Sequence, residues 1–232
     1  MIKNKSFLWL LVLFVCQSLF AQPNPIQITI SATYGSKMLN LADSAFHTND
    51  THHIQIMVLK FYISNIQFLQ KGKVVLQEKN SFHLVDLEAK STKVILLKNE
   101  NKMAFDELRF NLGIDSTTNV SGAMGGDLDP TKGMYWTWQS GYINFKLEGS
   151  SPICNTRNNE FQFHLGGYKK PHYCLQMISL PVQKTQNIQL NLDIQKILSP
   201  IDLTILNQIM SPSEEAVSMS IMAANAFTIL EN

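Results

Sequence analysis

Apolar and polar residues alternate with a period of two along much of the chain. The alternation is clearest over residues 26–30, 108–112, 143–147 and 188–194. Successive side chains of a β-strand point to opposite faces of its sheet, so each run predicts a strand with one face in a core and the other in water. Residues 54–69 are apolar on both faces, which predicts a long central strand. Lys71-Gly72 then predict a turn into a further strand over residues 74–76.

Helix signals gather near the C-terminus. Ser211, Pro212 and Glu214 are typical of an N-cap, a first-turn proline and a capping-box acid. They predict a helix from Pro212 to about Ala226, and residues 203–209 are expected to form another short helix. The predicted fold class is therefore mostly β: an antiparallel β-sandwich with a short C-terminal helix. No linker interrupts residues 22–232, so we expect them to form a single domain.

The first residues are typical of a secretory signal peptide. Lys3 and Lys5 precede an apolar run over residues 7–20, and the small Ala21 follows it. We expect cleavage after Ala21, which makes residues 1–21 a signal peptide and sends the rest to the periplasm or the cell surface. A lipoprotein signal that ends at Cys16 is the weaker alternative, because the residues before Cys16 are bulky. No later segment reaches the roughly 18 apolar residues of a membrane span, so no transmembrane segment is predicted.

The charge balance excludes one class of partner. Lys and Arg total 19 and Asp and Glu total 18, which gives a formal net charge of +1. A nucleic-acid-binding domain carries a clear basic excess, so no nucleic-acid partner is expected. Charged residues make up 16% of the chain and hydrophobic ones 45%, a balance that is typical of a folded protein rather than a disordered one.

Two cysteines remain after the predicted cleavage, Cys154 and Cys174. Because exported proteins meet an oxidising compartment, we expect a disulfide between them. On the chain-entropy model, closing a loop of about 20 residues stabilises a fold by about 3 kcal/mol. A thiolate metal site is the alternative, and the absence of a CxxC spacing makes it the weaker one.

No enzyme motif is present. The sequence has no GxSxG, no HExxH and no glycine-rich phosphate loop at a strand–helix junction, so we expect a binding protein and not an enzyme. The most distinctive segment covers residues 133–142 and contains Trp136 and Trp138. Residues two apart in a strand face the same side. A buried aromatic pair in the core is one interpretation of these tryptophans, and a functional site is the other.

Two histidines in predicted strands are candidate metal ligands. His164 lies just before the glycines at 166 and 167, and His83 lies in residues 82–86 with Asp86 nearby. A neutral imidazole binds a metal through one nitrogen while an acceptor holds the other. For each histidine alone, a solvated or turn-capping role is the alternative.

Carboxylates gather in a turn-rich stretch at Asp115, Asp127 and Asp129. Oxygen ligands clustered in a long loop are typical of calcium sites, so these residues are candidates for a second metal loop. Their spacing matches no EF-hand, and an Asp before Pro130 also commonly starts a turn.

The tryptophan segment also carries the most specific resemblance to a known family. Taken together, residues 61–66, 82–86, 110–116, 121–123, 128–130, 133–143 and 163–167 resemble the MbnP-like family. The resemblance covers roughly residues 26–227, which is most of the chain after the predicted signal peptide.

The resemblance implies an exported copper-binding protein that acts in copper acquisition or handling, in some cases beside methanobactin genes. In such proteins the copper ligands are two histidines and a kynurenine, which a partner dihaem protein related to the MauG peroxidases makes from a tryptophan. Carried over to this sequence, His164 is one ligand, His83 is the second, and Trp136 or Trp138 is the modified residue. Met134 lies nearby as a soft thioether donor. The tail at residues 225–227 matches the family loosely and contains no histidine.

A second class of function stays open. A β-sandwich at the cell surface also serves as an interaction module that binds a protein or a glycan without metal, with the tryptophans as core residues. The surroundings of His164 distinguish the two interpretations. A copper site needs this histidine beside an indole, with a second histidine converging on the same point.

Overall fold

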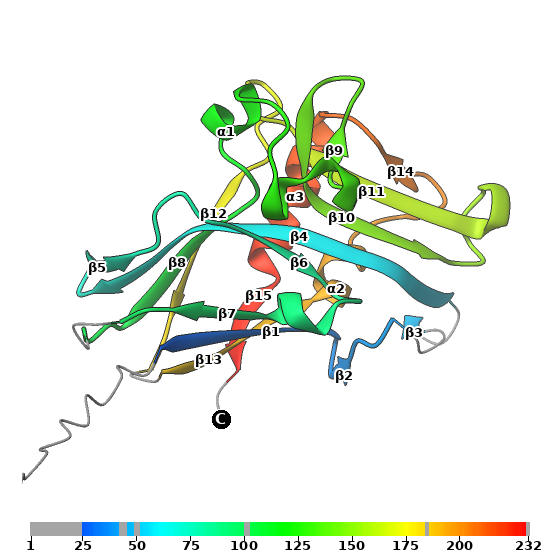
Figure 1. The fold of residues 1–232 in the computed structure, drawn as a ribbon. Helices are drawn as coiled ribbons and strands as arrows, with labels where there is room; N and C mark the ends of the chain where they lie inside the picture. Colours follow the sequence, from blue (N-terminus) through cyan, green and yellow to red (C-terminus); the bar gives the residue numbers. More distant parts are fainter. Residues whose placement is uncertain (1–24, 42–45, 49–51, 100–102, 184–185, 231–232) are drawn as a thin grey trace, which may run out of the picture.

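The structure is a computed structural model that describes residues 25–41, 46–48, 52–99, 103–183 and 186–230. The predicted signal peptide, residues 1–21, lies outside this part of the chain. The described residues form two β-sheets that pack face to face, so the prediction of a mostly-β sandwich is confirmed. Figure 1 shows the smaller sheet below the long strand β4 and the loops that carry α1 and β9 above it.

The smaller sheet has five strands. They are β1 (Ile26–Tyr34), β2 (Lys37–Met38), β7 (Val94–Leu97), β13 (Asn187–Asp193) and β15 (Phe227–Leu230). β13 lies between β15 and β1, while β2 and β7 both pair with β1. Every second residue of β1 is buried, as the sequence alternation predicts.

The larger sheet is built around β4 (His52–Gln70), the expected long central strand. One edge of β4 pairs with β6 and β5, and the other pairs with β10 and β8. The remaining members extend the sheet beyond β8 and β10 or attach to its ends. The bounds are β3 (Phe46–Thr48), β5 (Lys73–Gln77), β6 (Phe82–Asp86), β8 (Glu107–Leu112), β9 (Tyr135–Trp136), β10 (Gly141–Ser150), β11 (Glu160–Gly166), β12 (Gln176–Pro181) and β14 (Gln208–Ile209).

Two strand pairs are parallel, which corrects the expectation of purely antiparallel sheets. β1 pairs with β13 in parallel, with Ile28 opposite Ile188, and β11 pairs with β14 in parallel. Parallel neighbours need a long connection between them, and most of the larger sheet lies between β1 and β13 in the sequence.

The larger sheet buries side chains on both of its faces. Phe61 and Ile63 of β4 point into the main core between the sheets. Tyr62 points to the opposite, outer face, where it joins a second apolar cluster. This second cluster also contains Trp136 and Tyr142, and the loops above β4 cover it. The fold therefore builds a separate apolar layer on the outer face, beside the candidate functional residues.

The helices are α1 (Ser116–Val120), α2 (Ile194–Leu198) and α3 (Glu214–Asn225), with short 3₁₀ turns η1 (Lys90–Lys93), η2 (Gly126–Leu128), η3 (Pro130–Lys132) and η4 (Arg157–Asn159). The predicted C-terminal helix is confirmed as α3, but its N-cap is Ser213 and not Ser211. The Ser213 hydroxyl accepts a hydrogen bond from the Ala216 amide at 3.1 Å. Within the described residues, no helix combines the length and apolar character of a membrane span.

The short helix expected over residues 203–209 is absent from the described structure. Asp202 closes a turn there, because its carboxylate accepts hydrogen bonds from the backbone N–H and the hydroxyl of Thr204. The end of the segment then forms β14 beside β11. Pairing with an open strand of the sheet satisfies backbone groups that a short isolated helix would satisfy less well.

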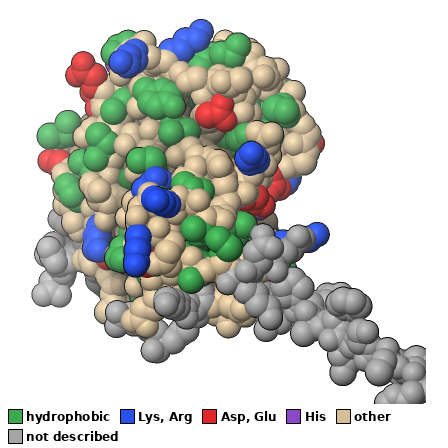
Figure 2. Space-filling model, turned by 90° about the vertical axis from the view of Figure 1, so that its left-hand side faces the viewer, with side chains coloured by type: hydrophobic (Ala, Val, Ile, Leu, Met, Phe, Trp, Pro, Cys, Tyr) green, Lys and Arg blue, Asp and Glu red, His purple; other side chains and the backbone are tan. Residues whose placement is uncertain are grey.

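Charge of one sign is not concentrated on the face that Figure 2 shows. Lys and Arg side chains are spread over this face, with Asp and Glu side chains among them. This distribution agrees with the near-zero net charge of the sequence.

The predicted disulfide between Cys154 and Cys174 is wrong. Both thiols are free and buried. Cys154 follows the end of β10 and its amide bonds to the Ser151 carbonyl, whereas the Cys174 amide bonds to the Gly167 carbonyl. The seven-residue strand β11 runs between these two points. At about 3.3 Å per residue, it holds the cysteines roughly 20 Å apart, well beyond the reach of a disulfide.

We expect both thiols to be unreactive in the native protein. Burial raises the pKa of the Cys154 thiol, and it raises the pKa of Cys174 to about 11, although a hydrogen bond with Ser220 acts in the opposite direction. The reactive thiolate is therefore scarce at neutral pH. Protein that lacks residues 1–21 should show two titratable thiols in denaturant and almost none when folded, and a reductant should not change its melting temperature. A single disulfide in non-reducing peptide mapping would contradict the structure.

Candidate functional site

Trp136 lies on the outer face of the larger sheet. It is the last residue of β9 and pairs with Gly141 of β10. Its ring lies over Gly166 of β11, so closely that a β-carbon on this glycine would come within 2.6 Å of the indole. The indole is only 5% exposed, and its Nε1 has no hydrogen-bond partner among the described residues. Burial of an N–H donor without a hydrogen-bond partner costs free energy. The indole N–H of Trp136 is therefore a buried polar group whose hydrogen-bonding capacity is not used.

Trp138 has the opposite environment. Its side chain is 64% exposed, although its ring centroid lies 6.0 Å from that of Trp136. The pair is therefore neither wholly core nor wholly surface: one indole is packed against β11 and the other reaches solvent. The interpretation of both tryptophans as core residues holds for Trp136 alone.

His164 forms a close pair with a carboxylate on the neighbouring strand. Its Nε2 lies 2.6 Å from Oε1 of Glu148 on β10, and its Nδ1 has no hydrogen-bond partner among the described residues. The imidazole is 7% exposed. Lys146 Nζ lies 3.3 Å from the same carboxylate oxygen. The hydrogen bond from His164 holds the pKa of Glu148 below its usual range, partial burial opposes this shift, and the charge of Lys146 supports it.

The indole and the histidine share one face of the sheet. His164 and Gly166 are two residues apart on β11, so the side chain of His164 and the α-hydrogen in the side-chain position of Gly166 point to the same face of the sheet. Trp136 covers Gly166 on that side. The structure therefore brings together Trp136, Trp138, His164 and a carboxylate, Glu148, that sequence analysis did not identify.

His83 does not belong to this group. On β6 it lies directly opposite Ile63 of β4, and directly opposed residues share a face of the sheet. Ile63 points into the main core, so His83 points away from the face that carries His164. Its Nε2 instead lies 2.7 Å from Oε2 of Glu78. The structure therefore separates the two histidines that the family resemblance implied as joint ligands.

The three loop aspartates have separate structural roles instead of converging on one point. Asp115 accepts hydrogen bonds from the backbone N–H and hydroxyl of Thr118, and Asp129 does the same for Thr131. Asp127 accepts from the Leu84 amide and pairs with Lys132 at 2.6 Å. A capping role accounts for Asp115 and Asp129, and an ion pair with a bond to β6 accounts for Asp127, so the structure does not assemble the three carboxylates as a calcium loop.

The residues near Trp136 supply some, but not all, of the donor atoms that a copper site needs. In the described part of the chain, no three His, Cys, Asp or Glu side chains are grouped so that they could hold a metal ion. His164 and Glu148 nevertheless offer one nitrogen and one oxygen donor that already meet. Imidazole and carboxylate are both ligands of divalent copper. A third donor has to come from the side chain at Trp136 or Trp138, because an intact indole has only an N–H donor to offer.

Substitution of Gly166 tests the contact between β11 and Trp136. For Gly166→Ala, the new β-carbon would also meet the Tyr142 carbonyl oxygen at 2.7 Å, so we expect a loss of about 1–3 kcal/mol in the free energy of unfolding. Gly125→Ala is the matched control, because its β-carbon meets no heavy atom within 4 Å. Urea unfolding followed by circular dichroism measures both. Equal stability of the two variants would contradict the packing of Trp136 on β11.

The fold and this site define a class of protein: a mostly-β sandwich that carries an indole pair beside a histidine–carboxylate pair on the outer face of its larger sheet. The family model for MbnP matches residues 23–212, a range that includes all four of these residues. The chain therefore belongs to the MbnP family.

Among solved structures, the chain is similar to MbnP from Methylosinus trichosporium. The TM-score is 0.56, the sequence identity is 11%, and the match covers 82% of each chain. At this identity the likeness concerns the fold alone. No curated protein matches the chain.

Proposed function

We propose that this chain is an exported copper-binding protein of the MbnP type, which acts in copper acquisition or handling by binding the metal and not by catalysis. Family membership supports the copper role. The observation that carries the proposal is the meeting of His164 and Glu148 on the face that Trp136 covers. In this arrangement His164 is the histidine ligand, and Glu148 is either the acceptor that orients its ring or a further oxygen donor.

The two ring nitrogens of His164 differ in whether they are available to bind a metal. Nδ1 is without a partner in the described structure, while Nε2 is held by Glu148. Binding through Nδ1 would leave the Glu148 hydrogen bond intact and would fix the tautomer, as a carboxylate does for many metal-bound histidines. The low pKa of Glu148 keeps this carboxylate ionised and ready to accept.

Trp136 is our choice for the residue converted to kynurenine. Conversion cleaves the C2–C3 bond of the indole oxidatively and then releases one carbon as formate by hydrolysis, with a net gain of one oxygen. It exposes an aryl amine and a carbonyl where the indole had only an N–H. The oxidant in this proposal is supplied by a dihaem partner of the MauG type. Trp136 supports the assignment because its buried Nε1 lacks a partner and its ring adjoins the strand of His164. The exposed ring of Trp138, 6.0 Å away, offers such a partner a surface to approach.

The first test is the mass of the protein purified from its native host. Peptide mass spectrometry should show loss of one carbon and gain of one oxygen at Trp136, and metal analysis of the same sample should show copper. The N-terminus of this protein should begin after residue 21, which tests the predicted export signal. Intact tryptophans together with no copper after incubation with copper(II) would overturn the proposal.

A further inference from the structure

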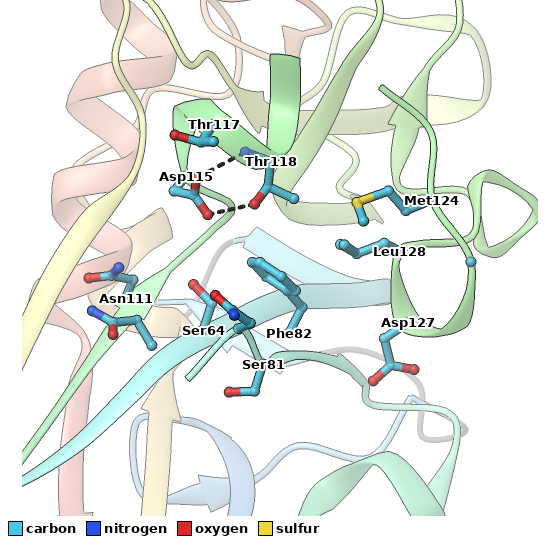
Figure 3. Close-up of a pocket in the computed structure, with 13 residues that line it drawn as sticks. Ser64, Ser81, Phe82, Asn111, Asp115, Thr117, Thr118, Met124, Asp127 and Leu128 are labelled. Carbon is cyan, nitrogen blue, oxygen red and sulfur yellow. Dashed lines mark hydrogen bonds between the residues drawn. The ribbon is translucent and has the colours of Figure 1, made fainter. Parts of the chain in front are cut away.

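A second candidate site lies on the outer face of the larger sheet, away from His164. It is a cavity of about 790 Å³ between the middle of β4, the start of β6, the end of β8, and the loops around α1 and η2. In Figure 3, Phe82 lies near its centre, with Asn111 and Ser64 on one side and Met124 and Leu128 on the other. Its volume lies in the range of roughly 300–1,000 Å³ that is typical of small-molecule sites.

Hydrogen bonds that cross between elements hold the walls of this cavity. The Tyr142 hydroxyl accepts from the Met124 amide and donates to the Leu128 carbonyl. The Tyr62 hydroxyl donates to the Asp127 carbonyl, and the Asp127 carboxylate accepts from the Leu84 amide. These bonds anchor the loop on one side to the sheet beneath it. The cavity is therefore a preformed feature of the fold, which reduces the entropic cost of binding a ligand.

Several polar side chains in the lining have no partner within the described protein. They are the amides of Asn80 and Asn111 and the hydroxyl of Thr117. The carboxylate of Asp115 accepts two hydrogen bonds, both from Thr118, and retains acceptor capacity. An amide donates and accepts at neighbouring atoms, and a hydroxyl does both at one atom. This set matches a ligand that carries several adjacent hydroxyl groups.

The apolar part of the lining suits the other face of such a ligand. Phe82 is half-buried, and its ring stands at the cavity in Figure 3 next to Leu128 and Met124. The face of an aromatic ring is electron-rich and attracts weakly positive C–H groups. A sugar ring presents C–H groups on one face and hydroxyls around its rim, so it can satisfy both parts of the cavity at once.

The charge of the lining disfavours the other polar ligands of this size. None of the described residues that line the cavity is basic, and two of them, Asp115 and Asp127, are acidic. Phosphate, sulfate and carboxylate ligands would meet repulsion without a compensating cation. Asp127 is already paired with Lys132, so a cationic ligand would have only the Asp115 carboxylate left as a counter-charge. A neutral ligand is therefore favoured over a charged one.

The geometry points to a saccharide site in this cavity: we propose that it binds a neutral mono- or disaccharide, with Phe82 against the sugar ring and Asn111 bonded to adjacent hydroxyls. This proposal is independent of copper, because none of the lining residues belongs to the group around His164. It assigns to the chain a second binding activity on the same outer face of the larger sheet.

The test uses the protein without residues 1–21 and a fixed set of probes. Glucose, galactose, mannose, N-acetylglucosamine and their disaccharides are measured by saturation-transfer NMR and titration calorimetry, with glucose 6-phosphate and spermidine as charged comparisons. We expect weak binding of at least one neutral sugar. Asn111→Ala and Phe82→Ala should each weaken it by roughly five- to tenfold. Asn225→Ala, at an exposed position at the end of α3, is the matched control and should bind as the wild type does.

A conservative variant of Phe82 and a copper-binding measurement separate loss of the sugar site from loss of the fold. Phe82→Leu retains apolar bulk but loses the aromatic face, so it should fold normally and still bind the sugar more weakly. Asn111→Ala and Asn225→Ala should bind copper as the wild type does. The Phe82 variants are left out of this comparison, because Phe82 packs against the apolar cluster that contains Trp136. Absence of binding by every neutral sugar, stronger binding of spermidine or glucose 6-phosphate, or sugar binding that survives in folded Asn111→Ala and Phe82→Leu would each overturn the saccharide site. None of these outcomes would bear on copper binding.

Discussion

Replacement of His164 by phenylalanine is expected to lower the copper(II) affinity of the protein purified from its host by roughly 100-fold or more. Loss of a partner that only orients a ligand already costs about 10–100-fold, and loss of the ligand itself should cost at least as much. Phenylalanine preserves the ring shape at this buried position while it removes both nitrogens. Competition against a chelator of known affinity measures the effect, and circular dichroism confirms that the sheet is intact.

His83→Phe is the matched control for this experiment. The substitution is chemically the same, and His83 also pairs with a glutamate, but it lies on the face opposite to that of His164. We expect its copper affinity to stay within a fewfold of the wild-type value. A large loss in His83→Phe, or none in His164→Phe, would contradict the placement of the copper site on the outer face.

The sequence pattern was sufficient to predict the elements that follow a strict period. The pattern predicted β4, the turn at Lys71 and Gly72, and the strand after that turn correctly. The order of apolar and polar residues shows directly whether one or both faces of a strand are buried. The N-cap of α3 was misplaced by two residues. Ser211 and Ser213 are equally good capping residues by type, and only the hydrogen bond to Ala216 distinguishes them.

The candidate site was predictable only where it depended on single residues. Trp136 and His164 stand out by type and local pattern, but the partner of His164 depends on the register between β10 and β11, which places Lys146 directly opposite and Glu148 within reach. The same limit explains His83. Its face is set by its pairing with Ile63, and a change of one residue in register would have moved it to the other side.

The predicted disulfide failed for a related physical reason. The separation of Cys154 and Cys174 in the sequence suggests a short loop between them, but the seven-residue strand β11 lies within that loop and places the cysteines at its two ends. A strand separates its ends by the largest distance that its length allows. Spacing along the chain is therefore informative about cysteine pairing only when the intervening residues turn back.

Replacement of Phe227 by alanine is expected to lower the free energy of unfolding by about 3–5 kcal/mol, a large share of the roughly 5–15 kcal/mol of a typical domain. Phe227 lies in β15 of the smaller sheet, beyond the range that the family model matches, and is 3% exposed. Its ring meets those of Phe61 and Phe110 edge-on, with centroids 5.6 and 5.5 Å away. These two residues belong to β4 and β8, so this one side chain joins the C-terminal strand to the centre of the larger sheet.

Leu230→Ala in the same strand is the matched control for Phe227→Ala. Leu230 is 42% exposed, so its truncation leaves little or no cavity and should change stability by about 0.5 kcal/mol or less. Urea unfolding monitored by tryptophan fluorescence gives the midpoint and slope for both variants. If Phe227→Ala unfolded at the same midpoint as Leu230→Ala, the C-terminal strand would be an appendage and not part of the core. The contacts of Phe227 with two strands of the opposite sheet favour a loss of several kcal/mol in the free energy of unfolding. Alanine is too small to reach either Phe61 or Phe110, and the surrounding rings cannot close the cavity without moving β4 or β8.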